Sequence, residues 1–316
     1  MKNQIHSKVQ YHTVEDEYHG QRVDNFLMRL LKGVPKGQIY RILRRGEVRV
    51  NKGRIKAHYR LQAGDQLRIP PLQLSVATPT TANQRSCDWL LSRILYEDER
   101  IIIINKPAGM AVHGGSGISL GVIEIMRQAR SDLHYLELVH RLDRETSGCL
   151  ILAKKRSALR QLHELLRNGE IQKRYLAIVK GPWQAGERRV DKPLDENVLR
   201  SGERIVRVNE HGKTAISIFK PMSVRSKASL MEVDILTGRT HQIRVHAAYC
   251  QHPIAGDEKY GDELFNREMV SRGCNRLFLH ARSLSFTLLT PTKDIAINAP
   301  LDPEWDKCLA KLKLDT

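Results

Sequence analysis

A stretch rich in proline, threonine, serine, glutamine and asparagine interrupts this chain of 316 residues near its first quarter. It runs over about 71–91, and its composition favours a linker over a packed element. Such an interruption requires at least two folding units, in agreement with the usual domain size of about 100–200 residues. We therefore expect a small domain over 1–72 with its core at about 20–70, a linker over 73–91, and a large domain over 92–316.

Positive charge is concentrated in the small domain. The whole chain has 52 Lys and Arg against 35 Asp and Glu, a net charge of +17. Residues 20–70 alone hold 13 Lys and Arg and 3 Asp and Glu, so more than half of the excess lies there. Clustered cations gain affinity for phosphates through counterion release. The pattern favours a nucleic-acid partner over a basic surface that serves only solubility.

Hydrophobic spacing in this basic segment predicts two helices followed by short strands. Apolar residues recur at helical spacing over 23–31, and a second helix is expected over 36–45 with Gly46 as its stop. Strands are expected at 48–50 and 67–69. A small basic module of this kind suits contacts with the phosphate backbone better than base reading. The candidate RNA-binding cations of the second helix and the following turn are Lys36, Arg41, Arg44, Arg45, Lys52 and Arg54.

The large domain alternates short apolar strands with turns and a few helices. Two or three helices are expected, one over 157–168 and one that follows Thr240 and ends before Pro253. This order predicts an α+β fold with a mixed, largely antiparallel sheet. The expected strands are 101–105, 136–139, 149–153, 175–180, 205–208, 216–219, 229–235 and 284–288.

Neither membrane insertion nor a cysteine scaffold suits this sequence. No run approaches the roughly 18 uncharged apolar residues of a membrane helix, and the first residues lack the apolar core of a signal peptide. We therefore expect a cytoplasmic protein with no membrane partner. The five cysteines are scattered without a C-x-x-C pair, which favours reduced, mostly buried thiols over disulfides or a zinc site.

An aspartate between two arginines is the first candidate for chemistry. Asp143 lies between Arg141 and Arg144 in a polar turn flanked by apolar strands. A carboxylate there is ionised at neutral pH and suits a nucleophile or a base, while capping of the turn is the structural alternative. His140 and Asp143 have the spacing of a metal pair but lack further ligands, so we expect no metal and no other cofactor.

Two further polar segments accompany this aspartate. The glycine-rich segment 105–117 fits neither the G-x-x-x-x-G-K-[ST] nor the G-x-G-x-x-G pattern, so we expect a flexible loop beside a site, not a nucleotide site. The segment 236–246 is a strand end, turn and helix start in which Thr240, Ile243 and Arg244 share a face. It suits the lining of a pocket for a carboxylate and a flat base. The alternative is a surface helix with salt bridges.

Together these segments resemble the RluA family of RNA pseudouridine synthases. The residues ahead of them, Arg-Ile-Leu-Arg-Arg-Gly-Glu-Val-Arg-Val-Asn at 41–51, resemble an S4-type RNA-binding domain. The resemblance implies a small S4 domain followed by a pseudouridine synthase catalytic domain with a mixed, largely antiparallel sheet. The matching synthase pieces are 105–107, His140-Arg141-Leu142-Asp143, 146–148, 172–177 and 238–246.

The resemblance also implies roles for individual residues. Asp143 aligns with the single catalytic aspartate, and Arg141 with an arginine that helps displace the target nucleotide from its helix. Tyr175 aligns with a tyrosine that stacks on the target base. Ile243 aligns with an aliphatic residue on the other side of the base, and Arg244 with an arginine that pairs with the aspartate.

The implied substrate is uridine in large-subunit (23S) rRNA, reached by base flipping. The RNA partner is then rRNA itself or a pre-ribosomal particle, and no protein partner is indicated. One alternative is an S4-domain ribosome-assembly factor that binds RNA without catalysis, against which the intact set of Asp143, Tyr175 and Arg244 argues. Another is a different base-flipping enzyme, such as a glycosylase or a methyltransferase, but no glycine-rich nucleotide loop follows a strand.

Overall fold

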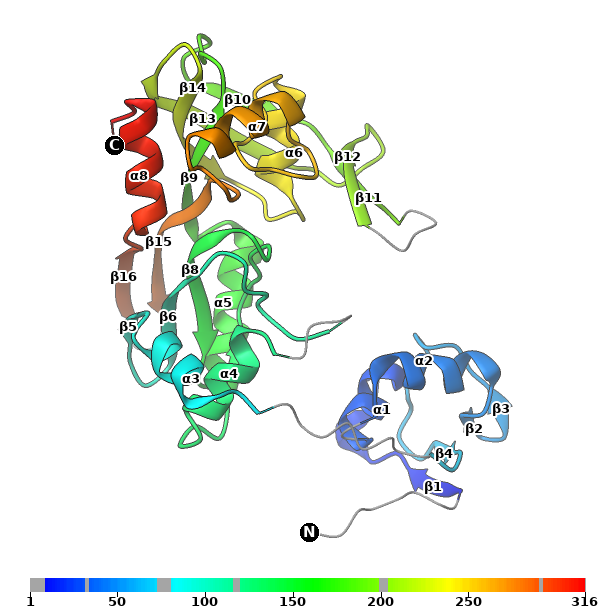
Figure 1. Cartoon of the computed structure of the whole chain (residues 1–316). Coiled ribbons are helices and arrows are strands. Elements are labelled where there is room, and N and C mark those ends of the chain that lie inside the picture. Colours follow the sequence, from blue (N-terminus) through cyan, green and yellow to red (C-terminus); the bar gives the residue numbers. More distant parts are fainter. Residues whose placement is uncertain are drawn as a thin grey trace. The chain divides into compact units, whose positions relative to one another are not determined.

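Two units make up the chain, over residues 1–80 and 81–316 (Figure 1). The computed structural model describes residues 9–31, 34–72, 81–115, 120–198, 204–289 and 292–315. Within these residues no helix has the length and apolar character needed to cross a membrane.

The first unit packs two helices against a four-stranded sheet of order β1-β4-β2-β3. Both predicted helices are confirmed, because their apolar stripes meet the inward residues Val50, Leu67 and Ile69 of the sheet in one core. The strand β1 was not predicted, since Gln-Tyr-His-Thr carries no apolar alternation and gains its structure from pairing with β4. The elements are β1 (Gln10–Thr13), the 3-10 helix η1 (Asp16–Tyr18), α1 (Val23–Leu30), α2 (Lys36–Arg45), β2 (Arg49–Val50), β3 (Gly53–Arg54) and β4 (Gln66–Ile69).

The carboxyl end of α2 is closed by Gly46 and Arg54. Gly46 adopts a left-handed conformation with φ +69°, which glycine tolerates without strain. Arg54 Nη2 donates to the carbonyl oxygen of Arg45 at 3.0 Å, so a cation satisfies the negative end of the helix. A Cβ on Gly46 would lie 2.1 Å from Arg54 Nε. The absence of a side chain at position 46 therefore allows Arg54 to reach the helix end.

The second unit is built on a long, twisted sheet (Figure 1). Its strand order is β10-β13-β14-β9-β15-β8-β6-β5, with β16 beside β15 and β7 beside β8, while β11 and β12 form a separate hairpin. All pairings in the long sheet are antiparallel except that of β8 with β15, which confirms the predicted mixed, largely antiparallel sheet. The strands are β5 (Ile94–Glu97), β6 (Ile101–Lys106), β7 (Glu137–Leu138), β8 (Ser147–Ala153), β9 (Gln172–Lys180), β10 (Arg188–Asp191), β11 (Leu194–Val198), β12 (Arg204–Val208), β13 (Ile216–Val224), β14 (Ala228–Ile235), β15 (Leu279–Leu289) and β16 (Thr292–Asn298).

Helices cover both faces of this sheet. Side chains of α3, α4 and α6 share a core with one face, and those of α5 and α8 pack on the other. The described part of this unit holds six helices, five of them within 92–316, so the expectation of two or three there was too low. Helices α4, α7 and α8 were not predicted, although Trp305, Cys308, Leu309 and Leu312 of α8 form a buried stripe at helical spacing. The helices are α3 (Gln84–Leu91), α4 (Val122–Ala129), α5 (Arg156–Asn168), α6 (Gln242–Tyr249), α7 (Glu263–Ser271) and α8 (Pro303–Leu312).

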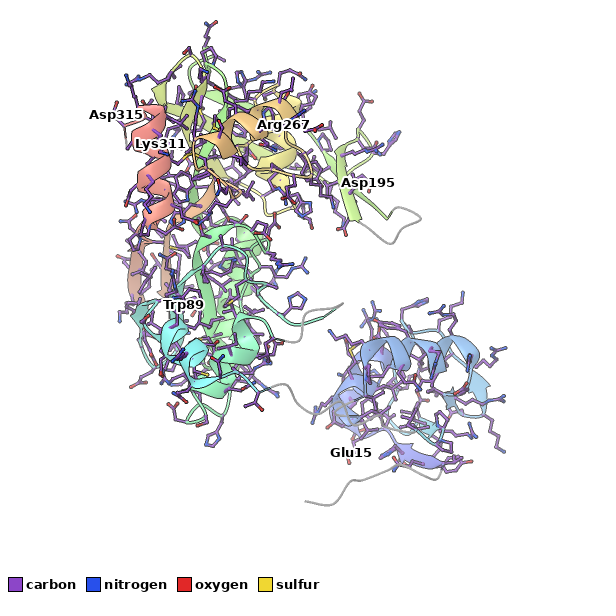
Figure 2. All side chains as sticks on the ribbon, viewed as in Figure 1. Glu15, Trp89, Asp195, Arg267, Lys311 and Asp315 are labelled. Atoms are coloured by element: carbon purple, nitrogen blue, oxygen red, sulfur yellow. A yellow bond between two sulfur atoms is a disulfide. The ribbon has the colours of Figure 1, made fainter. Side chains whose placement is uncertain are left out.

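The segment expected to be a linker contains helix α3. Residues 73–80 lie outside the described residues, but Asn83 caps a helix whose Cys87 and Leu90 are buried in the core shared with α4. The opposite side of this helix is exposed, and Trp89 lies there (Figure 2). The Arg93 guanidinium lies 4.5 Å from the centroid of the Trp89 ring. Because only one side of the helix is apolar, the polar composition of 81–91 concealed it. The second unit therefore begins at Thr81, ahead of the expected start at Ser92.

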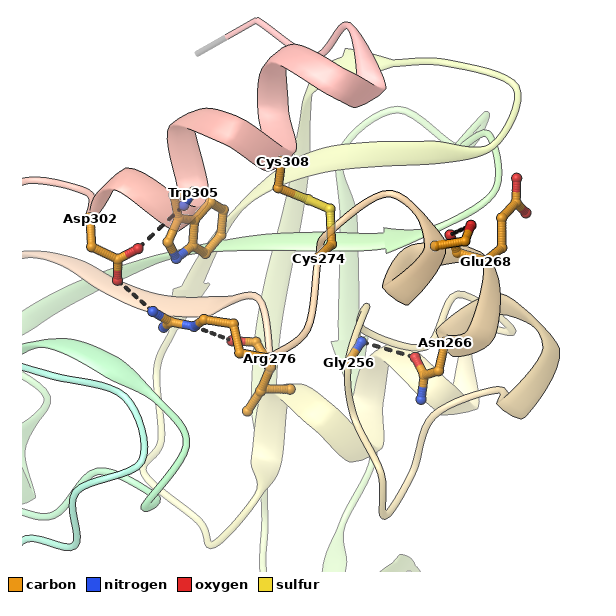
Figure 3. The surroundings of a disulfide bond; sticks show 10 residues. Gly256, Asn266, Glu268, Cys274, Arg276, Asp302, Trp305 and Cys308 are labelled. Atoms are coloured by element: carbon orange, nitrogen blue, oxygen red, sulfur yellow. Dashed lines mark hydrogen bonds and ion pairs between the residues drawn. A yellow bond between two sulfur atoms is a disulfide. The ribbon is translucent and has the colours of Figure 1, made fainter.

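Two cysteines are joined, contrary to the expectation of reduced thiols throughout. A disulfide links Cys274, which follows α7, to Cys308 on α8, with their Cα atoms 5.6 Å apart (Figure 3). Thirty-four residues separate the two in sequence. Packing of Trp305 of α8 against Phe278 brings the two cysteines together, a long-range contact that cysteine spacing cannot reveal. Cys87, Cys149 and Cys250 are buried free thiols, as expected.

The parallel contact between β8 and β15 is unusually close. Gly148 has φ +110°, and a Cβ there would lie 2.3 Å from the carbonyl oxygen of Ala281. Beside it, the Ser147 hydroxyl is 2.9 Å from His280 Nδ1 and accepts a hydrogen bond from Arg276 Nη2 at 2.7 Å. Residues near the end of the chain thus hold the start of β8, which directly follows the loop that carries Asp143.

Candidate active site

A cleft of about 990 Å³ opens over β9. Its walls are the loop 139–144 before β8, the loop 235–241 between β14 and α6, and the segment 111–115 after β6. A smaller cavity of about 80 Å³ shares Asp143 and Tyr175 with the cleft and is also lined by Ile243 and Arg244. The segments that the sequence singled out therefore converge at one place.

Asp143 lies in the cleft with one cation at its carboxylate. Its side chain is 25% exposed, and Arg244 Nη1 donates to Oδ2 at 3.4 Å. The loop is tightened by the Thr146 N–H, which donates to the Asp143 carbonyl oxygen at 3.2 Å. The carboxylate is thus accessible from the cleft and held from one side, which suits a reacting group better than a turn cap.

A second carboxylate orients Arg244. Arg244 Nε and Nη2 each donate to Asp257 at 2.7 Å, a bidentate contact in which both residues are buried. Asp257 also accepts the N–H groups of Lys259 and Tyr260. Although burial acts to raise it, the pKa of Asp257 is lowered by the Arg244 guanidinium and these N–H donors. Arg244 is therefore fixed in place and has one nitrogen left for Asp143.

His241 and Tyr260 complete the surroundings of the aspartate. His241 Nε2 is 3.8 Å from Asp143 Oδ2, and its Nδ1 lies 2.8 Å from the Tyr260 hydroxyl. Burial lowers the pKa of His241, with Asp143 acting in the opposite direction, so the imidazole is neutral at pH 7. His241 has φ +53° at the start of α6, and the Arg244 guanidinium lies 5.1 Å from the Tyr260 ring centroid.

Tyr175 and Ile243 supply flat and aliphatic surfaces to the site. Tyr175 comes from β9 and is 7% exposed, and Ile243 comes from the first turn of α6 and is 4% exposed. Both line the cavity beside Asp143. Burial, together with the nearby Asp143 carboxylate, raises the pKa of Tyr175 well above its usual range. The phenol is therefore neutral, and its ring is available for contact with an uncharged planar group.

Arg141 differs from these residues because it is exposed. It lies in the same loop as Asp143 and lines the cleft, with no pairing to a carboxylate among the described residues. Its neighbour Arg144 donates to the Gly109 carbonyl oxygen at 3.0 Å. A free guanidinium at the rim can enter a bound nucleic acid.

Lys106 is hydrogen-bonded to the loop that carries Asp143. The side chain is completely buried at the end of β6, and Nζ donates to the carbonyl oxygens of Pro107, Met110 and Arg144 at 2.7–2.9 Å. Burial lowers the pKa of Lys106 to about 7, against the opposing effect of Glu145 and Asp143. The beginning of the glycine-rich segment, expected to be flexible, is thus part of a strand with an anchored turn, and 116–117 lie outside the described residues.

The candidate RNA-binding cations all lie in the first unit and are exposed. Four come from α2 and two from the turn and strand that follow it: Lys36, Arg41, Arg44, Arg45, Lys52 and Arg54. Two of the six have protein partners in the described part of the chain: Arg45 is paired with Glu47 at 3.7 Å, and the Arg54 guanidinium is bonded to the end of α2. Arg54 contributes charge to this surface from a fixed position.

Sequence reasoning missed several residues of the site. His241 and Lys106 stood inside segments that had been singled out, but no role had been assigned to them. Asp257 had no local signal, since it lies in a separate loop 13 residues beyond Arg244. Thr146 lines the cavity, and its hydroxyl is buried without a hydrogen-bond partner in the described structure. In the same part of the chain, no three His, Cys, Asp or Glu residues cluster as metal ligands do.

Comparison with known proteins gives a consistent result. A family model described as RNA pseudouridylate synthase matches residues 100–249, and an S4 domain model matches 21–67. The chain is 52% identical over 311 residues to ribosomal large subunit pseudouridine synthase C of Pasteurella multocida (strain Pm70), with 98% of this chain and 95% of that protein covered. It is 53% identical over 298 residues to the protein of the same name from Escherichia coli (strain K12), with 93% of each covered.

A solved structure extends the match to three dimensions. Human RNA pseudouridylate synthase domain containing 4 has a TM-score of 0.61 and 27% sequence identity. The match covers 73% of this chain and 97% of the human one. The chain therefore belongs to the RNA pseudouridylate synthase family and carries an S4 domain ahead of its synthase domain.

Proposed function

We propose that this enzyme converts uridines of large-subunit rRNA to pseudouridine, with Asp143 as its catalytic residue. The substrate is suggested by relatives that are named ribosomal large subunit pseudouridine synthase C. The observation that carries the catalytic assignment is the carboxylate of Asp143 in the cleft, held by Arg244 beside the buried ring of Tyr175.

The reaction is an isomerisation that needs few functional groups. The N1–C1′ bond of uridine breaks, the base turns, and a C5–C1′ bond forms as a proton leaves C5 and one is gained at N1. An ionised carboxylate can assist as a nucleophile at C1′ or as a base toward a sugar proton. Many glycosidases add a second carboxyl group to protonate the leaving oxygen. Uracil delocalises the negative charge as it leaves, so one carboxylate is sufficient.

Arg244 has a clear function in this scheme. Its bidentate bond to Asp257 holds the guanidinium, so Asp143 receives a cation whose position does not depend on the substrate. Such preorganised charges need no rearrangement when the reaction occurs. His241 is close to Asp143 but neutral, so it adds little positive charge.

The detached base must stay in the site, because water would otherwise complete a hydrolysis. Tyr175 and Ile243 both line the cavity, and we expect the uracil ring to bind between these two apolar side chains. Stacking of a base on an aromatic ring contributes about 1–3 kcal/mol. Flipping a base out of a helix costs a few kcal/mol, so stacking alone barely compensates for it.

Phosphate contacts supply the remaining affinity. We expect Arg141, which lines the cleft and is exposed, to occupy the space that the flipped nucleotide leaves. The cations of the S4 unit add contacts with the RNA backbone, which explains why residues 20–70 contain more than half of the net charge. In this scheme the first unit supplies most of the affinity for RNA, and the second unit carries out the isomerisation.

Pseudouridine mapping tests the proposal. Unmodified large-subunit rRNA is incubated with the wild-type enzyme, with Asp143→Asn, or with Asp315→Asn as a control at an exposed residue that follows α8 (Figure 2). Carbodiimide labelling and reverse transcription then locate the product. We expect stops with the wild type and the control but none with Asp143→Asn, whose fold is maintained because Asp257 still binds Arg244.

Two results would contradict the proposal. Stops with Asp143→Asn would show that another group carries the reaction. An absence of stops with the wild type, both on rRNA and on a pre-ribosomal particle, would instead favour an RNA-binding assembly factor.

A further inference from the structure

Lys173 is a half-buried cation that lacks a partner. It lies on β9 and lines the cleft, and no hydrogen bond or ion pair of its ammonium group occurs among the described residues. Among the neighbouring cleft cations, Arg141 also lacks a carboxylate partner in the described structure but is exposed to solvent, whereas Arg239 and Arg144 are bonded to the protein. Arg239 Nε donates to the Thr214 carbonyl oxygen at 2.9 Å, and Arg144 contacts both the Gly109 carbonyl oxygen and Glu145.

The geometry of β9 directs Lys173 toward the proposed substrate. Residues two apart on a strand share a face and are separated by about 7 Å, so Lys173 stands beside Tyr175 on the side that faces the cleft. A Cβ on Gly238, in the opposite wall of the cleft, would lie 3.9 Å from Lys173 Nζ. The Lys173 ammonium group therefore lies next to the loop between β14 and α6, which also lines the cleft.

In the absence of a ligand, the unpaired charge of Lys173 destabilises the folded protein. Burial lowers the pKa of Lys173, and no carboxylate offsets the loss of hydration. A charge removed from water without a partner destabilises the folded state. Such a cation is favourable only when an anion enters the cleft and takes the place of the lost water.

We propose that the Lys173 ammonium group binds a backbone phosphate adjacent to the target uridine and so positions the flipped nucleotide over Tyr175 and Asp143. The inference rests on the proposed function, because it takes RNA as the occupant of the cleft. A phosphate lies one sugar away from its base, which is the scale of the step along β9 from Tyr175 to Lys173. Lys173 is therefore a positioning residue for the target nucleotide, separate from the cations of the S4 unit.

The first test measures RNA binding with the full-length enzyme. Lys173→Met removes the charge, Lys173→Arg keeps it, and Lys311→Met is a matched control on α8, which packs on the opposite face of the sheet (Figure 2). Affinity for a transcript of large-subunit rRNA is measured across a range of salt concentrations. We expect Lys173→Met to bind several-fold more weakly and to reduce the salt slope by about one. The arginine variant and the α8 control should keep the wild-type slope.

The second test asks which phosphate is bound. Neutral methylphosphonate linkages are placed on either side of the uridine that mapping identifies, and binding is measured again. One of these linkages should weaken binding by the wild type and leave binding by Lys173→Met unchanged. If the methylphosphonate linkage weakens binding of Lys173→Met as much as binding of the wild type, Lys173 does not contact a phosphate at this nucleotide and the proposal is wrong.

Thermal unfolding of the free enzyme separates binding from folding. Because the ammonium group has no partner, we expect Lys173→Met to raise Tm while it weakens RNA binding. A lower Tm together with an unchanged salt slope would show a structural role and overturn the proposal. Binding and unfolding need no turnover, so an enzyme that fails to make pseudouridine refutes the proposed function without deciding the role of Lys173.

Discussion

Lys106 binds three backbone carbonyl groups instead of a carboxylate, and the loop that carries Asp143 depends on it. Its Nζ donates to Pro107, Met110 and Arg144, the last of which is adjacent to Asp143. Lys106→Met keeps the length of the side chain and removes the donors. Three backbone carbonyl oxygens, one in a buried contact and two in partly buried ones, then lose this partner.

The size of the effect follows from these bonds. A buried polar group without a partner costs about 1–3 kcal/mol. Removal of the buried ammonium charge offsets part of this cost, because burial already disfavours the charged form and lowers the pKa of Lys106 to about 7. We therefore expect a loss of about 2–5 kcal/mol in the free energy of unfolding. A displacement of about 1 Å in the Asp143 loop should also reduce the single-turnover rate about 100-fold.

The assay compares Lys106→Met with Lys154→Met. Lys154 is also largely buried and donates to Glu97 and to the Asp98 carbonyl oxygen, but it follows the far end of β8. Both variants should unfold at lower urea concentration, and only Lys106→Met should lose rate at saturating RNA. A Lys106→Met enzyme within about 1 kcal/mol of wild-type stability and with its rate intact would refute the reasoning.

Further predictions concern stability, binding and pH. Asp257→Asn breaks the bidentate contact of a buried arginine and should cost about 3–5 kcal/mol of unfolding free energy in urea titrations; less than 1 kcal/mol would mean that Arg244 does not depend on it. Tyr175→Phe should keep stacking and the single-turnover rate, while Tyr175→Leu should lose about 1–3 kcal/mol of transition-state stabilisation, or roughly 5- to 160-fold in rate; equal rates would exclude stacking. Replacing three exposed cations of α2 with glutamate should weaken RNA binding and flatten its salt dependence, and an unchanged slope would remove the S4 unit as the electrostatic anchor; these are Lys36, Arg41 and Arg45. His140 Nε2 accepts the Ile151 N–H at 3.1 Å, and burial lowers the pKa of His140 to about 3. Below pH 6.5 the unfolded chain therefore binds a proton at His140 that the folded chain does not bind. As the pH is lowered, this difference should reduce the free energy of unfolding by about 1.4 kcal/mol per pH unit. His140→Gln should remove this contribution in urea titrations at pH 6.5 and 5, and an unchanged pH dependence would contradict the assignment.

Local patterns predicted much of this molecule. Helix α2 was expected over 36–45 and has those bounds, because its apolar stripe, outward cations and terminal glycine all lie within a dozen residues. The loop around Asp143 was found for a similar reason, since a polar turn between apolar strands is visible in a short window. Helical spacing indicated that Ile243 and Arg244 share one face of a helix. Asp143, Ile243 and Arg244 all line the same cavity.

Contacts between distant segments account for what was missed. Asp257 and Lys106 matter because of groups that folding brings to them, and neither has a neighbour in sequence that reveals this. The Cys274–Cys308 bond depends on where α8 packs. Helix α3 was hidden because its buried side consists of only a few residues in a polar segment. In each case the deciding information lies in tertiary packing.

The close contact of β8 with β15 determines when the enzyme can become active during its synthesis. Ser147 follows the Asp143 loop, yet its hydroxyl group is bonded by Arg276 and lies beside His280, about 130 residues later in the chain. A ribosome must therefore translate most of the protein before the loop gains its final support. Folding that depends on such distant partners is slow, because a large stretch of chain must be ordered before the contact forms. We thus expect nascent chains that end before residue 276 to bind RNA through their first unit long before they can modify it.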